Sequence, residues 1–282
     1  MAPARTDQTT TFEGQPAVVL ANPAGDRAVV LLHGAHVVSW TPAGGREWLY
    51  LSPASRFGEG ASIRGGVPVI FPQFNQRGPD FAVPRHGFAR NRPWRLESHG
   101  GDAATLLLED DEATRRLWPH AFALRLAVRL APARLELVLD AANTGSTGFA
   151  FTAALHTYFA IGDIASTRLH GLQGVRCLDT VSGEAGRGSG AALRFAGETD
   201  MIWYDLPRPL SLETPQGTLE VAMSGFPDAV VWNPWAERAA ALPDLPDDDY
   251  RRMLCVEAAA IDRPVRLDPG EVWSGRQVLT AR

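Results

Sequence analysis

The sequence of 282 residues has only two cysteines, Cys177 and Cys255, and they lie far apart. Two cysteines cannot build the disulfide framework of a small secreted domain, and they fit a reducing cytosol better. No run of apolar residues approaches the roughly 18 that a membrane-spanning helix needs. The first residues, M-A-P-A-R-T-D-Q-T-T-T-F, lack the apolar region of a signal peptide. We therefore expect a soluble, cytoplasmic protein.

Positive charge is also scarce. The chain has 27 Lys and Arg against 32 Asp and Glu, which gives a net charge of −5. Nucleic-acid binding needs a basic face, so we expect no nucleic-acid partner. The sequence contains no glycine-rich phosphate loop with its lysine and no G-x-S-x-G elbow. These absences exclude nucleotide hydrolysis and the common serine hydrolase designs.

The chain has instead many short apolar runs separated by Gly, Pro, Asn and Asp. In some of them apolar and polar residues alternate, as expected for strands with one buried face. The runs lie at 28–32, 37–40, 103–108, 122–128, 135–139, 149–159, 272–274 and 277–279.

Helical patterns are few and short. Residues 111–118 could form two turns that end before Pro119, and residues 235–242 could form another that ends before Pro243. Many strands with almost no helix between them predict an all-β fold, an antiparallel sandwich or barrel with a few short helices. A β-sandwich of this length can be one domain, so we expect residues 1–282 to form a single domain.

The H-G-A-H sequence places His33 and His36 three residues apart. In a strand, this spacing would point the two side chains to opposite faces of the sheet. No carboxylate or cysteine stands nearby as a third ligand, so the pattern is a weak metal signal. We expect neither a metal nor another cofactor.

Two ionisable residues lie in apolar surroundings. His156 follows a predicted hairpin in A-A-L-H-T-Y-F, and Glu257 follows M-L-C-V and precedes three alanines. His156 could be a hydrogen-bonded core histidine, and Glu257 could reach solvent at a strand end. If both are buried, the pair suits acid and base catalysis, because burial raises the pKa of a carboxyl group toward the range in which imidazole titrates.

Arginines form a second group of candidates. Arg64, Arg85 and Arg90 lie in segments otherwise built for packing, and arginine binds phosphate or carboxylate with paired hydrogen bonds. Salt bridges to the chain's own carboxylates are the alternative, and we expect that role for Arg92 and Arg95. The acidic segment 244–250 is interpreted as a solvated loop.

Five segments together resemble a known family. They are R-G-G-V-P-V-I-F-P-Q-F, R-H-G-F-A-R, L-H-T-Y-F, V-W-N-P-W and M-L-C-V-E-A, in that order along the chain. Their order and spacing resemble the hexose-6-phosphate mutarotases, the glucose-6-phosphate 1-epimerase branch of the aldose 1-epimerase superfamily. The resemblance extends from about Gly34 to Gln277 and is specific in combination, although H-G-F-A-R alone also suits the wider superfamily.

The resemblance implies a large antiparallel β-sandwich of the galactose mutarotase-like type and a reaction that interconverts the α and β anomers of a hexose 6-phosphate. It implies that His156 handles the proton of the ring oxygen and that Glu257 removes the proton of the anomeric hydroxyl. The substrate-binding residues implied are Arg64, His86, Arg90 and Asp200, and no cofactor is implied. Such a protein would be a monomer whose partner is a small sugar phosphate.

Two positions depart from the family pattern. Arg85 stands where members often have glutamine, and we include it among the substrate-binding candidates. Met201 stands where an arginine is common, which weakens the match at Asp200. Trp232, Trp235 and Phe88 could pack against a sugar or belong to the core. Two other functions stay open, an aldose 1-epimerase for unphosphorylated sugars and a non-catalytic module that binds sugar phosphates.

Overall fold

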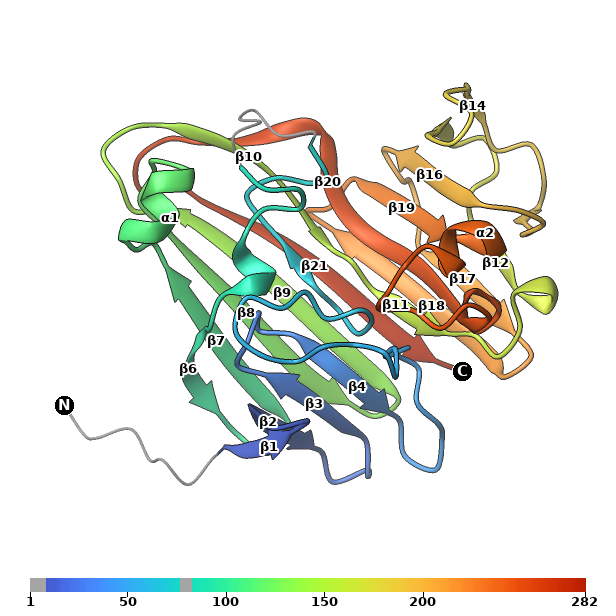
Figure 1. Cartoon of the computed structure of the whole chain (residues 1–282), viewed down its shortest axis with the longest axis horizontal. Coiled ribbons are helices and arrows are strands. Elements are labelled where there is room, and N and C mark those ends of the chain that lie inside the picture. The colour runs from blue at the N-terminus through green and yellow to red at the C-terminus, as the bar shows by residue number, and fades with distance from the viewer. Residues whose placement is uncertain (1–8, 77–82) are drawn as a thin grey trace.

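The computed structural model describes residues 9–76 and 83–282, which form three antiparallel sheets (Figure 1). Residues 1–8 lie outside the described residues. They belong to the N-terminal stretch in which the sequence analysis expects no signal peptide. The smallest sheet has four strands, β1 (Thr10–Phe12), β2 (Gln15–Ala21), β3 (Arg27–Leu31) and β4 (Val37–Thr41). The prediction of an all-β, antiparallel fold is confirmed.

The two large sheets contain the other strands. The eight-stranded sheet has the order β14 (Ala185–Arg187), β13 (Arg176–Asp179), β16 (Thr199–Tyr204), β19 (Asp228–Asn233), β20 (Met253–Leu267), β10 (Phe149–Leu155) and β5 (Val69–Ile70), with β11 (Tyr158–Ala160) paired to β20. The nine-stranded sheet has the order β15 (Ala192–Leu193), β12 (Arg168–His170), β17 (Leu210–Thr214), β18 (Gly217–Ser224), β21 (Val272–Ala281), β9 (Arg134–Asn143), β8 (Phe122–Ala131), β7 (Ala103–Glu109) and β6 (Arg95–His99).

Helices are short, as the sequence predicts. Helix α1 (Glu112–Leu117) starts with a capping box in which Asp111 Oδ1 accepts from the N–H of Thr114 at 2.6 Å. Helix α2 (Trp235–Ala240) ends before Pro243. The 3₁₀ turns are η2 (Ala89–Asn91), η3 (Ile164–Ser166) and η4 (Asp249–Arg251). Among the described residues, none of these helices has the length and apolar character needed to cross a membrane.

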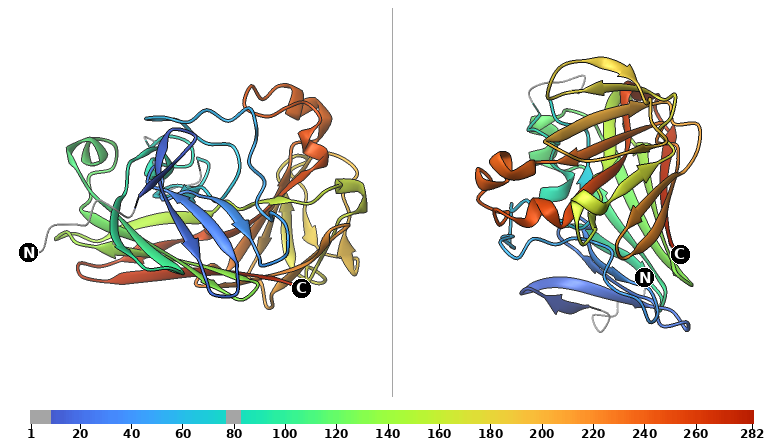
Figure 2. Two further views of the ribbon diagram at one scale, coloured as in Figure 1. Left: turned by 90° about the horizontal axis from the view of Figure 1, so that it is seen from below. Right: turned by 90° about the vertical axis from the view of Figure 1, so that its right-hand side faces the viewer.

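The main hydrophobic core lies between the two large sheets. Val256 and Ala258 of β20 belong to the same cluster as Leu137 of β9 and Leu279 of β21. The other face of the eight-stranded sheet is covered in part by helix α2, whose Ala239 packs with the outer-face residues of that sheet. Figure 2 (left) shows α2 on the side of the molecule opposite the long strands of the nine-stranded sheet. The first nine residues of β20, 253–261, are therefore buried on both faces.

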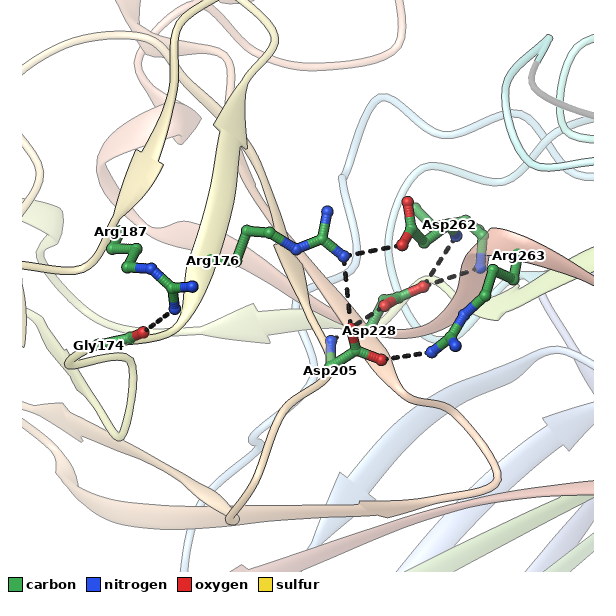
Figure 3. A network of polar contacts seen from close by, with 8 residues as sticks. Gly174, Arg176, Arg187, Asp205, Asp228, Asp262 and Arg263 are labelled. Atoms are coloured by element: carbon green, nitrogen blue, oxygen red, sulfur yellow. Dashed lines mark hydrogen bonds and ion pairs between the residues drawn. The ribbon is translucent and has the colours of Figure 1, made fainter.

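A polar cluster at one end of the eight-stranded sheet fixes how β19 and β20 align (Figure 3). The buried Asp228 carboxylate accepts from the N–H groups of Ile261 and Asp262 at 3.1 and 2.9 Å. Arg176 bridges Asp262 at 2.8 Å and Asp205 at 3.4 Å. Buried polar groups of this kind are satisfied only in one register, so they hold β20 in place along the sheet. That register decides which residue of β20 faces the site described next.

Candidate active site

Glu257 lies on the outer face of β20. Its neighbours Val256 and Ala258 point into the core between the large sheets, whereas Cys255 and Ala259 belong to clusters on the outer face. The alternation of a strand therefore places Glu257 outward, opposite Val230 in register. The Glu257 side chain is nevertheless only 1% exposed. Of the two alternatives that the sequence leaves open for this residue, the buried carboxylate is the one observed.

His156 follows a strand instead of lying inside one. Strand β10 ends at Leu155 and β11 begins at Tyr158. Between them, the N–H of Thr157 donates to the carbonyl oxygen of Leu155 at 3.0 Å and makes a tight turn around His156. The predicted strand at His156 is wrong, because apolar composition does not reveal this turn. The imidazole stacks on the ring of Tyr158, with centroids 4.9 Å apart.

The His156 and Glu257 side chains meet, with Nε2 of the histidine 3.2 Å from Oε1 of the glutamate. The second carboxylate oxygen, Oε2, is buried and has no hydrogen-bond partner within the part of the chain that the structure describes. Polar atoms in such a position usually serve a ligand, because an unpaired buried acceptor costs about 1–3 kcal/mol.

The surrounding protein shifts the pKa values of Glu257 and His156 in opposite directions. Burial raises the pKa of Glu257 well above its ordinary value, and the neighbouring Asp200 carboxylate adds to the rise. Burial also lowers the pKa of the His156 imidazole, and the positive charges of Arg90 and Arg64 lower it further. Because the carboxyl pKa moves up and the imidazole pKa moves down, burial favours the form of the pair in which a single proton lies on Glu257 and both groups are neutral.

Arg64 lines the same pocket as this pair. Its Nη1 donates to the Tyr158 hydroxyl at 3.1 Å, and its Nη2 donates to Oδ1 of Asp244 at 3.0 Å. The guanidinium also lies 5.8 Å from the centroid of the Trp232 ring. Asp244 belongs to the acidic segment 244–250, so the prediction of a merely solvated loop is wrong for this residue.

The two glycines after Arg64 allow its backbone to pass close to neighbouring strands. Gly65 and Gly66 have φ values of +122° and +59°. A Cβ atom on Gly65 would lie 2.3 Å from the carbonyl oxygen of Tyr50, and one on Gly66 would lie 2.3 Å from that of Val37. Only glycine fits both constraints. The R-G-G motif therefore holds Arg64 at a fixed position beside the pocket.

The R-H-G-F-A-R segment contributes its histidine through an unusual backbone conformation. His86 has φ of +65°, and its Nδ1 accepts from the N–H of Asn75 at 3.2 Å. The neutral ring must then carry its proton on Nε2. Burial lowers the pKa of His86 to about 3, and the charges of Arg90 and Arg85 contribute to this shift. The ring centroid lies 5.7 Å from that of His156.

The two flanking arginines of this segment differ in exposure. Arg90 lies in η2 and is half-buried, and desolvation together with the charges of Arg64 and Arg85 lowers its pKa. Arg85 is exposed. Within residues 9–76 and 83–282, neither arginine has a carboxylate oxygen within 4.0 Å, so neither forms an ion pair there. Arg92 and Arg95, by contrast, lie 3.6 Å from Asp111 and Glu109, and their predicted structural role is confirmed.

Asp200 completes the set from strand β16, where it pairs in register with Trp232 of β19. Burial raises the pKa of its carboxyl group. All seven residues that the sequence analysis names as catalytic or substrate-binding line one pocket: Arg64, Arg85, His86, Arg90, His156, Asp200 and Glu257. Of the three aromatic candidates, Trp232 lines this pocket, while Phe88 is buried in the main core.

Tyr158 and Arg238 are among the pocket residues that escaped the sequence analysis. Tyr158 joins Arg64 to His156, and Arg238 of helix α2 reaches the pocket while donating to Glu198 at 2.6 Å. Tyr158 belongs to the L-H-T-Y-F motif, so its place beside His156 could have been found there. Arg238 has no comparable signal, because its neighbours along the chain are ordinary helix-forming residues.

The donor atoms of His156, Cys255 and Glu257 lie within 4.8 Å of one another, all three buried. Burial raises the pKa of the Cys255 thiol well above its ordinary value, so the thiolate that metals prefer is disfavoured. The nearby guanidinium groups of Arg64 and Arg90 would also repel a cation. This donor set therefore suits a proton-transfer pair better than a metal site. Both cysteines are buried and have free thiols.

Comparisons with known proteins all point to one family. A profile described as Aldose 1-epimerase matches residues 16–280. A protein of Cenchrus ciliaris named "Putative glucose-6-phosphate 1-epimerase" is 37% identical over 96% of this chain and 86% of its own length. An Escherichia coli protein of the same name is 36% identical over 83% of this chain and 79% of its own length.

A solved structure shares the fold. The crystal structure of "a putative mutarotase" from Salmonella typhimurium superposes with a TM-score of 0.85 at 30% identity. The match covers 97% of this chain and 93% of the other.

Proposed function

This chain belongs to the aldose 1-epimerase family, and on that premise we propose that it interconverts the α and β anomers of a hexose 6-phosphate, most simply glucose 6-phosphate. The observation that carries the proposal is a buried Glu257–His156 pair at the base of a pocket lined by four arginines. The pair supplies acid and base chemistry, and the arginines supply affinity for an anion.

The reaction needs one base and one acid at neighbouring oxygens of the sugar. The Glu257 carboxylate takes the proton of the anomeric hydroxyl, the electron pair forms the C1 carbonyl, and the bond between C1 and the ring oxygen breaks. His156, which holds the single proton of the pair when Glu257 is ionised, gives it to that ring oxygen. Rotation about the C1–C2 bond and closure with the two roles exchanged gives the other anomer, so no atom or charge is left over.

The geometry of the ligand-free pair suits this exchange. The 3.2 Å contact between His156 Nε2 and Glu257 Oε1 places the acid and the base side by side. A bound sugar would replace this mutual contact by bonds to its anomeric and ring oxygens. His86 Nε2–H and the Asp200 carboxylate are then a donor and an acceptor for the remaining hydroxyl groups.

The phosphate is assigned to the arginines that lack a carboxylate partner. Arg64 is paired with Asp244 and Arg238 with Glu198. Arg85 and Arg90 lack such a partner within the described ranges. An unphosphorylated sugar gives no reason to bring uncompensated positive charges to a pocket, because like charges repel. A phosphoryl group would neutralise them and accept paired hydrogen bonds from their guanidinium groups.

A comparison of substrates tests this assignment. We expect Arg90→Gln and Arg85→Gln to raise KM for glucose 6-phosphate, by about tenfold or more for Arg90, because a hydrogen bond to a charged group is worth about 1.5–3 kcal/mol. Neither substitution should change the slow exchange of free glucose. Anomer exchange followed by NMR gives KM for glucose 6-phosphate and the exchange rate of free glucose. Arg95→Gln is the control, since Arg95 pairs with Glu109 outside the pocket.

Two results would favour the other functions. Equal rates for glucose and its phosphate ester, with arginine variants like the wild type, would indicate an aldose 1-epimerase for neutral sugars. Calorimetric binding of the ester without accelerated exchange would indicate a binding module. We also propose that the chain acts as one domain and as a monomer in the cytoplasm, without a cofactor or a nucleic-acid partner. The net charge of −5 and the two free thiols support this setting.

A further inference from the structure

The H-G-A-H sequence has no role in the proposed chemistry, yet it touches both segments that carry the inner arginines. It connects β3 to β4 as a turn, with Gly34 and Ala35 at φ of +71° and +46°. The two histidines therefore do not point to opposite faces of a strand. Their ring nitrogens instead lie against backbone carbonyls of the same loop, residues 61–65.

The first set of contacts holds the loop that ends in Arg64. His33 Nε2 lies 2.9 Å from the carbonyl oxygen of Ala61, and His36 Nε2 lies 2.7 Å from that of Gly65. A carbonyl only accepts hydrogen bonds, so each Nε2 must carry a proton and donate it. His36 is 1% exposed, which makes its hydrogen bond hard to replace by water. Arg64 thus lies between two anchored carbonyls.

The second set of contacts holds the segment that carries Arg90. The N–H of Gly34 donates to the carbonyl oxygen of Arg92 at 2.7 Å. A Cβ atom on Gly34 would lie 2.6 Å from the carbonyl oxygen of Arg90, so only glycine permits this approach. Asn91 closes the arrangement, since its Nδ2 donates to the carbonyl oxygen of Ala61 at 2.9 Å. The turn, the Arg64 loop and the Arg90 segment therefore contact one another pairwise.

We propose that the H-G-A-H turn is a positioning element that fixes Arg64 and Arg90 relative to each other and so sets the affinity of the pocket for its anionic substrate. The proposal deepens the proposed function and rests on it for the identity of the anion. Neither histidine touches the proposed reacting atoms, so the turn acts through the two arginines. Its loss should therefore weaken binding and leave the Glu257–His156 chemistry in place.

The test compares two replacements of His36. Leucine removes the donor to the Gly65 carbonyl, whereas glutamine has an amide N–H at a similar reach and should restore it. We expect His36→Leu to raise both KM for glucose 6-phosphate and Kd for inorganic phosphate by about tenfold, with kcat within about twofold of the wild type, as for a loss of uniform binding. His36→Gln should return both constants to near wild-type values.

A control separates positioning from general destabilisation. His99 of β6 makes the same type of bond, from Nε2 to the carbonyl oxygen of Val19 at 3.3 Å, and neither residue lines the pocket. His99→Leu should leave KM and the phosphate Kd unchanged. If His36→Leu does not fold, His33→Leu, whose bond to Ala61 is only partly buried, takes its place in the same comparison with His33→Gln.

The outcomes for the two proposals are distinct. A wild-type protein that binds phosphate but does not accelerate exchange would contradict the proposed function, while the phosphate Kd of the His36 variants still decides the role of the turn. A wild-type protein that accelerates exchange, with KM and phosphate Kd unchanged in His36→Leu, would overturn the positioning role alone. An equal fall of kcat in the Leu and Gln variants would also overturn it. A wild-type protein that neither binds phosphate nor accelerates exchange would contradict both.

Discussion

At the scale of single residues, Glu257 and His156 can share a proton because the protein removes both from water. A carboxyl group and an imidazole have ordinary pKa values two units apart, and burial moves the first up and the second down. Charged neighbours then act in both directions, since Asp200 raises the pKa of Glu257 and Arg90 lowers it. A pair tuned in this way can give and accept a proton in either direction of the reaction, as anomer exchange demands.

The buried carboxylate should have a cost in stability. Because the pKa of Glu257 is raised in the folded state, its stabilising contribution is fully present below the ordinary pKa of about 4.3 and is lost as the pH rises through the folded value. We therefore expect Glu257→Gln to unfold at a higher temperature than the wild type at pH 8 and at about the same temperature at pH 4. Calorimetry at both values checks this, and a lower unfolding temperature at pH 8 would contradict it.

Part of the candidate site could be predicted from the sequence. The apolar residues around Glu257 predict its burial as one of two alternatives. The five motifs contain six of the seven predicted site residues that line the pocket, and Asp200 lies outside them. No local pattern indicates that Asp244 would reach Arg64, because those residues are 180 positions apart. Such contacts depend on how distant loops meet, and this is decided by the packing of the whole sheet.

At the scale of elements, the loops around the eight-stranded sheet carry the charges and the strand β20 carries the base. The segment after helix α2 illustrates how an acidic loop can serve an anion site. Asp244 pairs with Arg64, and Asp249 is buried and accepts from the Tyr50 hydroxyl at 2.5 Å. The segment therefore packs onto the protein through two of its carboxylates, and its acidity is only partly a feature of solvated surface.

The Asp244–Arg64 pair should restrain anion affinity, because the Asp244 carboxylate offsets the positive charge that Arg64 adds to the pocket beside Arg90. We expect Asp244→Asn to lower KM for glucose 6-phosphate by about two- to fivefold, since a partly exposed ion pair is worth up to about 1 kcal/mol. Asp247→Asn, an exposed substitution in the same segment, is the matched control. A KM that rises in Asp244→Asn would show that the carboxylate mainly orients Arg64.

Element boundaries follow from the sequence where local chemistry decides them. Helix α1 lies within the predicted range because Asp111 caps it and Pro119 follows. The predicted runs 272–274 and 277–279 are one strand, β21 (Val272–Ala281). Gly275 lies between them and continues the strand, paired in register with Leu139 of β9. The turn at His156 and the H-G-A-H turn were not predictable from apolar pattern. Besides local bonds, each is held by a hydrogen bond to a distant segment: the N–H of His156 donates to the carbonyl oxygen of Pro68 at 3.0 Å, and His36 Nε2 donates to that of Gly65.

At the scale of the whole molecule, the fold holds several histidines in their neutral form. Burial lowers the pKa of His36 to about 4 and that of His86 to about 3. Each depressed pKa means that the folded state disfavours the proton. The contribution of these histidines to the free energy of unfolding is therefore present above the ordinary pKa of 6.5 and is lost as the pH falls toward the folded values.

This linkage predicts a loss of stability in mild acid. Between pH 6.5 and pH 4 we expect the free energy of unfolding to fall by on the order of 3 kcal/mol through His36 alone, since one pKa unit corresponds to about 1.4 kcal/mol. His36→Gln, which cannot gain a proton, should lose less stability over the same interval. Urea unfolding at several pH values gives the difference, and parallel curves for the two proteins would contradict the prediction.

The all-β architecture is predictable from many short apolar runs, whereas the depth and the shape of the pocket are not. They depend on β20 being covered on both faces, by the nine-stranded sheet on one side and by helix α2 and its following loop on the other. This double coverage is what turns an ordinary glutamate of a strand into a base with a raised pKa. The same scaffold therefore accounts for the fold and for the acidity of its proposed catalytic pair.

The central claim is that this pair opens and closes the ring of a hexose 6-phosphate. Its most direct test is the rate of α–β exchange of glucose 6-phosphate, measured by NMR magnetisation transfer with wild-type protein and with Glu257→Gln. The wild type should accelerate exchange well above the uncatalysed rate, and Glu257→Gln should lower kcat by about 10²–10⁴-fold. Exchange that stays at the uncatalysed rate with the wild type, or at the wild-type rate with Glu257→Gln, would contradict the claim.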